Sequence, residues 1–265
     1  MKTLVIADVH EQVVRLSGIL KRESDYGKAV FTGDYFDSKC AEVAGVDKTL
    51  QMVLGLIEDS RNILLIGNHD AHYLFPNNPY IACSVKSARY MQTIGAQLHI
   101  LKRHLKFYHY DTDLKVLFTH AGITDKLYEK KFSDLSIDDK LDFLDFAITE
   151  ATKQLITRDE PDKLVSVGYD RGGMNRHGGL FWGDLRKHYV IPGLKQIFGH
   201  TQVAEPVAIT LKRDVFPLIS TPNYKPEDSY SIGNDTGLDT YLSIENGIAS
   251  IKDTDTGEDR GQFQI

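Results

Sequence analysis

Five short clusters rich in His, Asp and Asn contain the residues of this chain whose types and spacing could do chemistry. Four of the five follow an apolar, β-branched run, and the last follows a shorter apolar run. The clusters are Asp8-Val9-His10, Gly33-Asp34-Tyr35-Phe36-Asp37, Gly67-Asn68-His69-Asp70, Thr119-His120-Ala121-Gly122 and Gly199-His200-Thr201. Oxygen and nitrogen ligands without a thiolate suit two closely spaced divalent ions better than one structural zinc. The clusters therefore predict a dinuclear metal site at the edge of a sheet.

The expected ligands form two sets that share one carboxylate. Asp8 and His10 are two residues apart just beyond a predicted strand, so in an extended loop both can turn toward one ion. Asp34 is expected to bridge, because a shared carboxylate is needed to hold two like-charged ions roughly 3.5–4 Å apart. The second ion would take its other ligands from later strand ends, namely Asn68, His120 and His200.

Such a site predicts hydrolysis of a phosphoric ester. A water that bridges two divalent ions loses much of its proton affinity and becomes a nucleophile near neutral pH. The ions also neutralise phosphoryl oxygens and hold the ester for in-line attack. His69 stands next to a ligand but should point away from it, which suits it to protonate the leaving oxygen as a general acid. Asp37, three residues past Asp34, is placed to orient His69.

Each cluster taken alone also has an ordinary structural explanation. A single histidine such as His120 is more often a core or loop residue than a ligand. Asp34 with Asp37 fits a helix N-cap and its first turn, and residues 67–70 fit a turn. The combination of five clusters, in this order and after successive predicted strands, favours the metal site.

The elements that must position these clusters alternate along the first part of the chain. Apolar patterning predicts strands at 3–7, 28–32 and 62–66 and helices at 11–22 and 47–59. The β-α-β-α-β order implies a parallel sheet covered by helices. Ligands bind at the carboxyl ends of such strands, and this is where Asp8, Asp34 and Asn68 stand.

The rest of the chain is less regular. We expect a helix at 84–101, paired strands at 105–110 and 115–119, and an amphipathic helix at 136–156 inside a helical insertion of about residues 124–175. Short strands are expected to return at 196–198, 207–211, 218–220, 240–245 and 248–252. The polar tail 253–261 is expected to be loosely held. Without a repeat or a linker, residues 1–265 are interpreted as a single α/β domain.

Composition excludes several classes of function. The net charge of −6 argues against duplex nucleic acid as the main partner, because phosphate neutralisation needs a basic face. Cys40 and Cys83 form no C-x-x-C pair, so a disulfide framework is not expected and a reducing cytoplasm fits. The apolar run at 3–7 is too short for a signal sequence, and no run is long enough to span a membrane. Composition leaves the oligomeric state open.

The order D-x-H, G-D-x-x-D, G-N-H-D, H-A-G and G-H-T resembles the calcineurin-like metallophosphoesterase superfamily from Asp8 to His200. Ile232–Gly237 is similar to the I-D-T-G segment of its phosphoprotein phosphatase branch, which includes Ser/Thr phosphatases and bis(5′-nucleosyl)-tetraphosphatases. The resemblance implies a four-layer α/β/β/α sandwich with two mixed β-sheets. It implies two divalent ions, usually manganese with iron or zinc possible, on the same six ligands. His69 and Asp37 would be the catalytic pair.

The chain departs from that branch around the phosphate. The branch reads G-D-x-x-D-R-G, whereas Ser38 and Lys39 follow Asp37 here. Lys39 would replace a bidentate guanidinium with a point charge. The branch also has glycine after D-x-H, where this chain has Glu11. These two differences weaken the case for a protein phosphatase. Residues 171–186 resemble the second-arginine region, which makes three arginines candidate phosphate contacts, with solvated surface residues as the alternative: Arg171, Arg176 and Arg186.

Three functions follow from the sequence. The first is a metal-dependent phosphatase that hydrolyses a phosphomonoester or nucleotide-like phosphoanhydride in a phosphorylated small molecule, nucleotide or phosphoprotein. The second is a phosphodiesterase or nuclease, whose branch commonly ends in G-H-x-H, where this chain has Gln202. The third is a non-catalytic binding scaffold, disfavoured because all six ligand positions and His69 are present.

Overall fold

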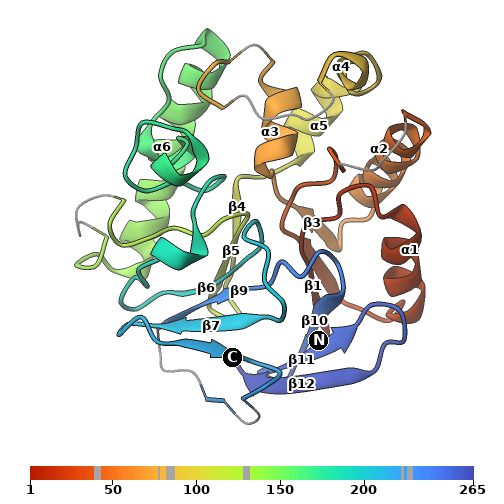
Figure 1. Cartoon of the computed structure of the whole chain (residues 1–265), viewed down its shortest axis with the longest axis vertical. Helices are drawn as coiled ribbons and strands as arrows, with labels where there is room; N and C mark the ends of the chain where they lie inside the picture. The colour runs from red at the N-terminus through yellow and green to blue at the C-terminus, as the bar shows by residue number, and fades with distance from the viewer. Residues whose placement is uncertain (39–42, 77, 82–86, 128–131, 222–223, 226–228) are drawn as a thin grey trace.

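The computed structural model describes residues 1–265 except 39–42, 77, 82–86, 128–131, 222–223 and 226–228. Two six-stranded mixed sheets form its centre (Figure 1). In spatial order, the first sheet consists of β12 (Asp259–Gln264), β11 (Ile248–Asp253), β10 (Thr240–Glu245), β1 (Thr3–Ile6), β2 (Lys28–Phe31) and β3 (Asn62–Leu64). The second consists of β4 (Tyr108–Asp111), β5 (Val116–Thr119), β6 (Lys195–Phe198), β9 (Tyr230–Gly233), β7 (Val207–Thr210) and β8 (Val215–Pro217).

Each sheet has three neighbouring parallel strands. β1, β2 and β3 run parallel in the first sheet, and β5, β6 and β9 do so in the second. Their carboxyl ends are the natural place for a site, because loops that leave parallel strands meet at one edge of the sheet. Every cluster named above follows one of these strands.

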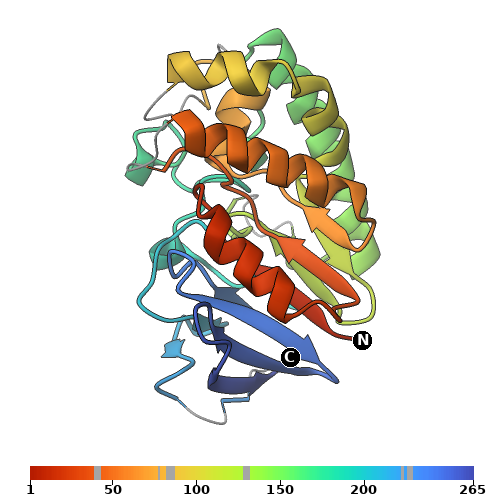
Figure 2. The same ribbon diagram turned by 90° about the vertical axis from the view of Figure 1, so that its right-hand side faces the viewer.

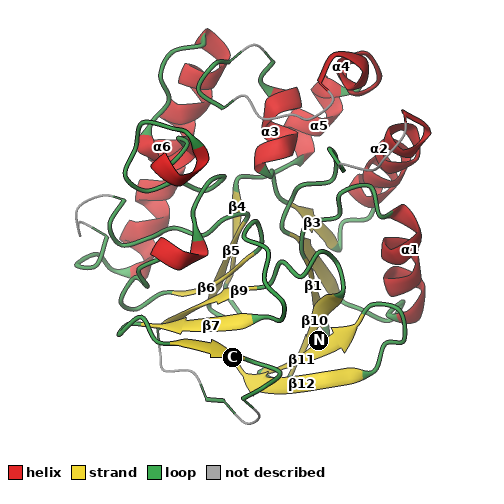
Figure 3. Cartoon of the chain, in the orientation of Figure 1, coloured by secondary structure: helices red, strands yellow, loops and turns green. Residues whose placement is uncertain are grey.

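Helices lie outside the sheets (Figures 2 and 3). They are α1 (Val13–Arg22), α2 (Val43–Glu58), α3 (Asn68–Leu74), α4 (Ser87–Gly95), α5 (Leu98–His104) and α6 (Ile137–Thr157), with short 3₁₀ turns η1 (Lys163–Val165), η2 (Tyr169–Arg171) and η3 (Leu185–Lys187). α6 is capped by Ser136, whose hydroxyl accepts from the Asp139 N–H at 3.1 Å. It lies beside β4, where the Tyr108 hydroxyl donates to Asp145 at 2.8 Å.

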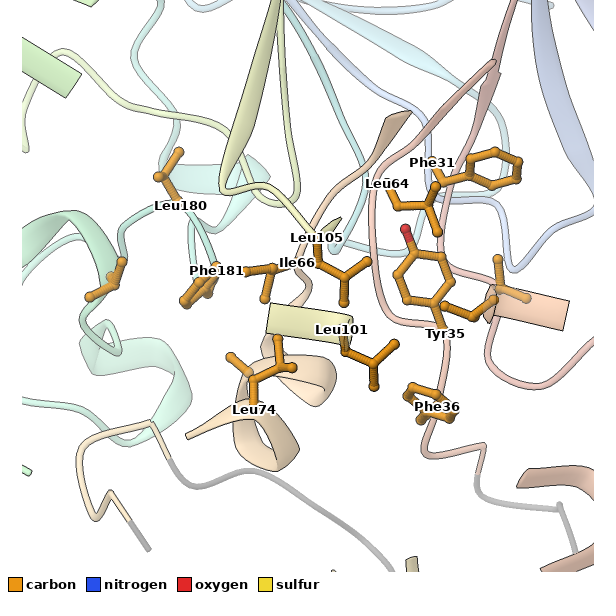
Figure 4. Packing of buried hydrophobic residues seen from close by; sticks show 14 of the residues in the cluster. Phe31, Tyr35, Phe36, Leu64, Ile66, Leu74, Leu101, Leu105, Leu180 and Phe181 are labelled. Carbon is orange, nitrogen blue, oxygen red and sulfur yellow. The ribbon is translucent and has the colours of Figure 1, made fainter. Parts of the chain in front are cut away.

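Strand residues alternate between two apolar cores. Val5 and Val30 face the core between the sheets, together with Phe118 and Ile197 of the second sheet. Leu4 and Ile6 face the helices instead. Figure 4 shows part of this outer core, in which Tyr35 of the loop after β2 lies with Leu64 of β3 and Leu101 of α5. Both faces of the parallel strands are therefore buried, which holds their ends rigid.

The predicted strands and helices that precede the clusters are confirmed. Other expectations were wrong. The helix expected at 84–101 is two helices, α4 and α5, and the strand expected at 218–220 lies three residues earlier as β8. The apolar pattern of the helix expected at 136–156 includes Phe146 on its buried face, but this side chain is 67% exposed on α6.

The polar tail is also ordered differently from the expectation. Most of β12 is exposed, yet its backbone pairs with β11 and Phe263 reaches the core between the sheets. Backbone pairing needs no apolar run, so composition missed this strand. β9 and α3 were missed as well, because each is short and contains polar residues at buried positions.

Among the residues that the structure describes, no helix combines the length and the apolar character needed to cross a membrane.

Candidate metal centre

Loops from both sheets bring the candidate ligands together. Asp8, Asp34 and Asn68 follow β1, β2 and β3, whereas His120 and His200 follow β5 and β6. All five lie within four residues of the end of their strand. Four of them are almost fully buried, namely Asp8, Asp34, Asn68 and His120.

The backbone at this edge is held in uncommon conformations. Asp8, His10, Asp34 and His200 have positive φ angles of 26°, 40°, 53° and 66°. For residues other than glycine, this region is sparsely populated and costs of order 1–3 kcal/mol per residue. Such strain persists only where the surrounding fold fixes it, and its concentration on four candidate ligands points to a functional site.

The first ligand group consists of Asp8, His10 and Asp34, whose ligand atoms all lie within 4.8 Å of one another. His10 Nδ1 lies 3.0 Å from the carbonyl oxygen of Phe36, to which it can donate. That bond assigns the lone pair to Nε2, which lies 3.8 Å from Asp34 Oδ2. A histidine fixed in this way by a backbone carbonyl is a typical metal ligand.

The second group consists of Asp34, His120 and His200, again within 4.8 Å. His120 Nδ1 lies 2.8 Å from the Thr32 carbonyl oxygen, and donation there leaves a lone pair on Nε2. This Nε2 lies 2.8 Å from Asn68 Oδ1 and 3.2 Å from His200 Nδ1, and Asn68 Oδ1 lies 2.9 Å from the same His200 atom. With Nδ1 as the donor, His120 Nε2 and Asn68 Oδ1 both present lone pairs at 2.8 Å, and a cation between them would relieve their repulsion.

Proton affinities at the site agree with this interpretation. Burial alone would raise the pKa of Asp34, but the charges of His120, His69 and other nearby histidines bring it down to about 2. Burial lowers the pKa of His120 and of His200. A lowered pKa on each of Asp34, His120 and His200 favours the deprotonated form, which is the form that binds a metal ion.

Asp8 lies in an excess of buried negative charge. Its pKa is raised by burial and then by the charges of Asp235 and Asp34. Burial also raises the pKa of Asp235. Clustered buried carboxylates are costly unless a cation compensates them. The donor set is carboxylate, imidazole and amide oxygen, with Asp34 common to both groups, and it fits two divalent ions.

His69 lies on the N-terminal turn of α3 and faces a carboxylate. Its Nδ1 is 3.0 Å from Asp37 Oδ2, while the Tyr73 hydroxyl donates to Asp37 Oδ1 at 2.5 Å. Asp37 is buried, and the His69 side chain is 20% exposed. The His69 and His10 rings lie edge to face with centroids 5.3 Å apart. The pair assigned from the sequence is therefore in hydrogen-bonding contact beside the first ligand group.

Asp70 ties two of the ligand loops together. Its carboxylate accepts the backbone N–H groups of Gly67, Asp34 and Tyr35 at 2.7–3.0 Å. Burial and the Asp34 charge raise its pKa to about 7. Gly67 is required at this crossing, because a Cβ there would meet the carboxylate and the backbone nitrogen of Asp34.

The structure places the four candidate phosphate contacts differently from one another. Arg171 and Arg176 line cavities beside the site, and the charge of Arg171 contributes to the lowered pKa of His200. The Arg186 side chain is 73% exposed and forms an ion pair with Asp184 at 2.5 Å, so it is not directed at the ligands. Lys39 lies outside the described residues.

Three residues of this site were missed by the sequence reasoning: Tyr73, Asp70 and Asp235. Asp235 follows β9, the sixth parallel strand, and its side chain interacts with Asp8. The available signal was the Asn234-Asp235-Thr236-Gly237 segment, which repeats the pattern of a strand followed by a polar residue.

Comparison with known proteins gives one family and a set of solved structures. The family model described as calcineurin-like phosphoesterase matches residues 1–204. The fold is similar to the crystal structure of a cold-active protein-tyrosine phosphatase of a psychrophilic Shewanella species. That match has a TM-score of 0.60 and 16% identity and covers 100% of this chain and 80% of the other.

A purple acid phosphatase from yellow lupin (Lupinus luteus) seeds matches with a TM-score of 0.52 and 12% identity, over 100% of this chain and 53% of that one. No curated protein sequence matches the chain. The family match spans all five clusters and ends just beyond His200. The chain belongs to the calcineurin-like phosphoesterase family and is a metal-dependent phosphoester hydrolase.

Proposed function

We propose that the protein is a phosphatase that hydrolyses a phosphomonoester or a nucleotide-like phosphoanhydride. The observation that carries the proposal is the shared position of Asp34 between two groups of ligand atoms. Two divalent ions bound there, most suitably manganese, would supply a deprotonated water at neutral pH and neutralise the phosphoryl oxygens.

The ligands in this proposal are the five residues of the two groups and Asn68. Asp8 and His10 would hold one ion, and Asp34 would be shared. Asn68, His120 and His200 would hold the other, supported by their convergence within 2.8–3.2 Å.

His69 acts as the general acid in this proposal. Because Asp37 occupies Nδ1, the proton that reaches the leaving oxygen would come from Nε2. Asp37 keeps the imidazole oriented and stabilises its protonated form, and the Tyr73 hydroxyl fixes Asp37 in turn. This arrangement gives a monoester leaving group its proton at the moment the bond to phosphorus breaks.

Hydrolysis of p-nitrophenyl phosphate, compared with bis(p-nitrophenyl) phosphate, tests the proposal. The monoester should be cleaved faster, activity should disappear with a chelator, and manganese should restore it best. Metal analysis of the reconstituted protein should give about two ions per chain. One tightly bound zinc without a response to manganese contradicts the proposal, as does a preference for the diester.

A cytoplasmic location stays a prediction from the sequence.

A further inference from the structure

We propose that a basic cavity beside the metal centre is a phosphate-binding subsite that holds a second phosphate group of the substrate. The cavity has a volume of about 580 Å³ and is lined by Lys126, Leu127, Lys163, Asn175, Arg176, His177 and Tyr189. The inference rests on the proposed phosphatase function and narrows its substrates to those with two phosphate groups.

The described lining of the basic cavity carries three cationic side chains and no carboxylate. The cations come from three separate segments: Lys126 from the loop after β5, Lys163 from η1 and Arg176 from the loop after η2. Segments that are far apart in the sequence thus direct like charges at one space. A phosphate dianion bound in this space would be attracted by all three charges.

These cations lack the ion pairs that their neighbours have. In the part of the chain that the structure describes, no carboxylate pairs with Lys126, Lys163 or Arg176. Just outside the cavity, by contrast, Lys187 pairs with Asp170 and Arg186 pairs with Asp184. The unpaired cations are therefore the ones whose charge remains available to a ligand.

His177 adds a hydrogen-bonding group to the same wall. Its Nδ1 is buried and has no hydrogen-bond partner among the described residues. Burial and then the charges of Arg176, Lys187 and Lys126 lower the pKa of His177. The wall thus contains a buried ring nitrogen whose hydrogen-bonding capacity the described residues leave unused.

The basic cavity shares two lining residues with a narrow cavity whose wall includes a tryptophan packed against a candidate metal ligand. Arg176 and His177 also line a second, narrow cavity, together with Arg171 and Trp182. The two carboxylates of that cavity, Asp170 and Asp184, are paired with Lys187 and Arg186. The Trp182 ring packs edge to face against the His200 ring, with centroids 5.7 Å apart. In this proposal, a substrate whose scissile phosphate lies at the metal ligands places its second anionic group in the basic cavity.

A series of linear alkanediol bisphosphates tests the proposal, because increasing chain length scans the distance between the two phosphates. The matched substrates are alkyl monophosphates of the same lengths, and p-nitrophenyl phosphate reports the basal activity. For at least one length, kcat/KM should exceed that of the monophosphate by about tenfold or more, roughly 1.4 kcal/mol. No preference at any length overturns the proposal.

The double variant Lys126→Gln/Lys163→Gln identifies the cavity as the cause. The preference for the bisphosphate should fall to about threefold or less, while p-nitrophenyl phosphate is hydrolysed at the wild-type rate. Lys21→Gln/Lys153→Gln removes the same charge from exposed positions outside the cavity and should keep the preference. A preference that survives in the cavity variant contradicts the proposal.

Free inorganic phosphate tests whether the basic cavity binds a phosphate group of the substrate or a separate phosphate ion. If it changes p-nitrophenyl phosphate turnover in the wild type but not in the cavity variant, and no bisphosphate is preferred, the cavity binds a separate effector and the proposal is wrong. Absence of p-nitrophenyl phosphate hydrolysis in the wild type would instead contradict the proposed function.

Discussion

The roles of individual ligands at this site depend on which atom of each side chain is available. His10 and His120 both place Nδ1 against a backbone carbonyl, which leaves Nε2 for the ion. His200 differs, because its Nδ1 faces Asn68 and His120 while its Nε2 is buried without a hydrogen-bond partner among the residues that the structure describes. We therefore expect the histidines of this site to bind through different nitrogens, Nε2 in His10 and His120 and Nδ1 in His200.

Asp34→Asn and His69→Asn should separate metal binding from proton transfer. Asp34 is common to both ligand groups, so loss of its charge should lower the metal content well below two ions per chain. His69→Asn should keep the metal content and lower kcat by about 10²–10⁴-fold. Metal analysis and kinetics on the two variants check this, and metal loss in His69→Asn would show that the roles are wrongly assigned.

Phosphate affinity is expected to depend on the arginine segment more than on Lys39. At least one of the single variants Arg171→Ala, Arg176→Ala and Arg186→Ala should lower kcat/KM by about tenfold, roughly 1.4 kcal/mol. Arg171 is the first candidate, because its charge reaches His200, and Arg186 the last, because Asp184 pairs with it. Wild-type kinetics in all three, with activity lost in Lys39→Ala, would place the phosphate at the Asp37 loop instead.

At the scale of elements, the site is built by short loops that cross at very close range. Asp70 on α3 accepts backbone N–H groups from the loop after β2, so the two loops are fixed to each other. The crossing leaves no room for a side chain at Gly67 or at Gly199, where a Cβ would meet Asp34 or Asp8 respectively. The glycines of the sequence clusters are thus part of the geometry of the ligands.

Gly67→Ala should displace Asp34 and lower the metal content. Forcing a methyl group into a closed contact typically costs about 1–3 kcal/mol of stability. Gly55→Ala is the matched control, because an added Cβ there meets nothing within 4 Å and the residue is exposed on α2. It should raise stability by about 0.5–1 kcal/mol through helix propensity. Denaturant unfolding and metal analysis measure both effects, and an unchanged metal content in Gly67→Ala would refute the crossing argument.

At the scale of the whole molecule, both ends of the chain belong to one sheet. β1 near the N-terminus pairs with β10, and β12 near the C-terminus completes the same sheet. Helices, sheets and the segment 124–175 share the outer core, to which Leu127 and Leu144 contribute. We propose on this basis that residues 1–265 form one domain.

One domain should unfold in one transition. Circular dichroism follows the helices, and the single tryptophan, Trp182, reports the metal-centre side by fluorescence. The two signals should give coincident denaturant curves. Separate midpoints would instead indicate that the insertion around α6 unfolds on its own.

Acid stability is expected to depend on His188. Burial lowers the pKa of this residue to about 3, and its Nε2 lies 2.8 Å from the Ser231 hydroxyl. In the unfolded chain the residue takes up a proton below about pH 6.5, whereas the folded protein excludes it down to about pH 3. The unfolded state therefore binds more protons in this interval, and stability falls as the pH falls, by up to about 1.4 kcal/mol per pH unit.

His188→Gln removes this titrating side chain and keeps a hydrogen-bonding group for Ser231. The free energy of unfolding, measured in urea at a series of pH values below about 6.5, should decrease less steeply in the variant than in the wild type. Other titrating groups are common to both proteins and cancel in the difference. Parallel curves would mean that His188 is protonated in the folded state.

The sequence by itself determined which segments carry the chemistry. Strand patterning and polar strand ends are local properties, so the five clusters and the strands before them were predictable. The pairing of His69 with Asp37 was predictable too, because both stand at fixed offsets from their strand ends.

Only the tertiary structure decided how these segments meet. The nitrogen that His120 offers depends on the Thr32 carbonyl, 88 residues away, and Asp235 joins the site only because β9 pairs with β6. The cations of the basic cavity likewise come from separate loops whose side chains have no common sequence pattern. Contacts between distant segments follow from packing of the two sheets, and no local periodicity encodes them.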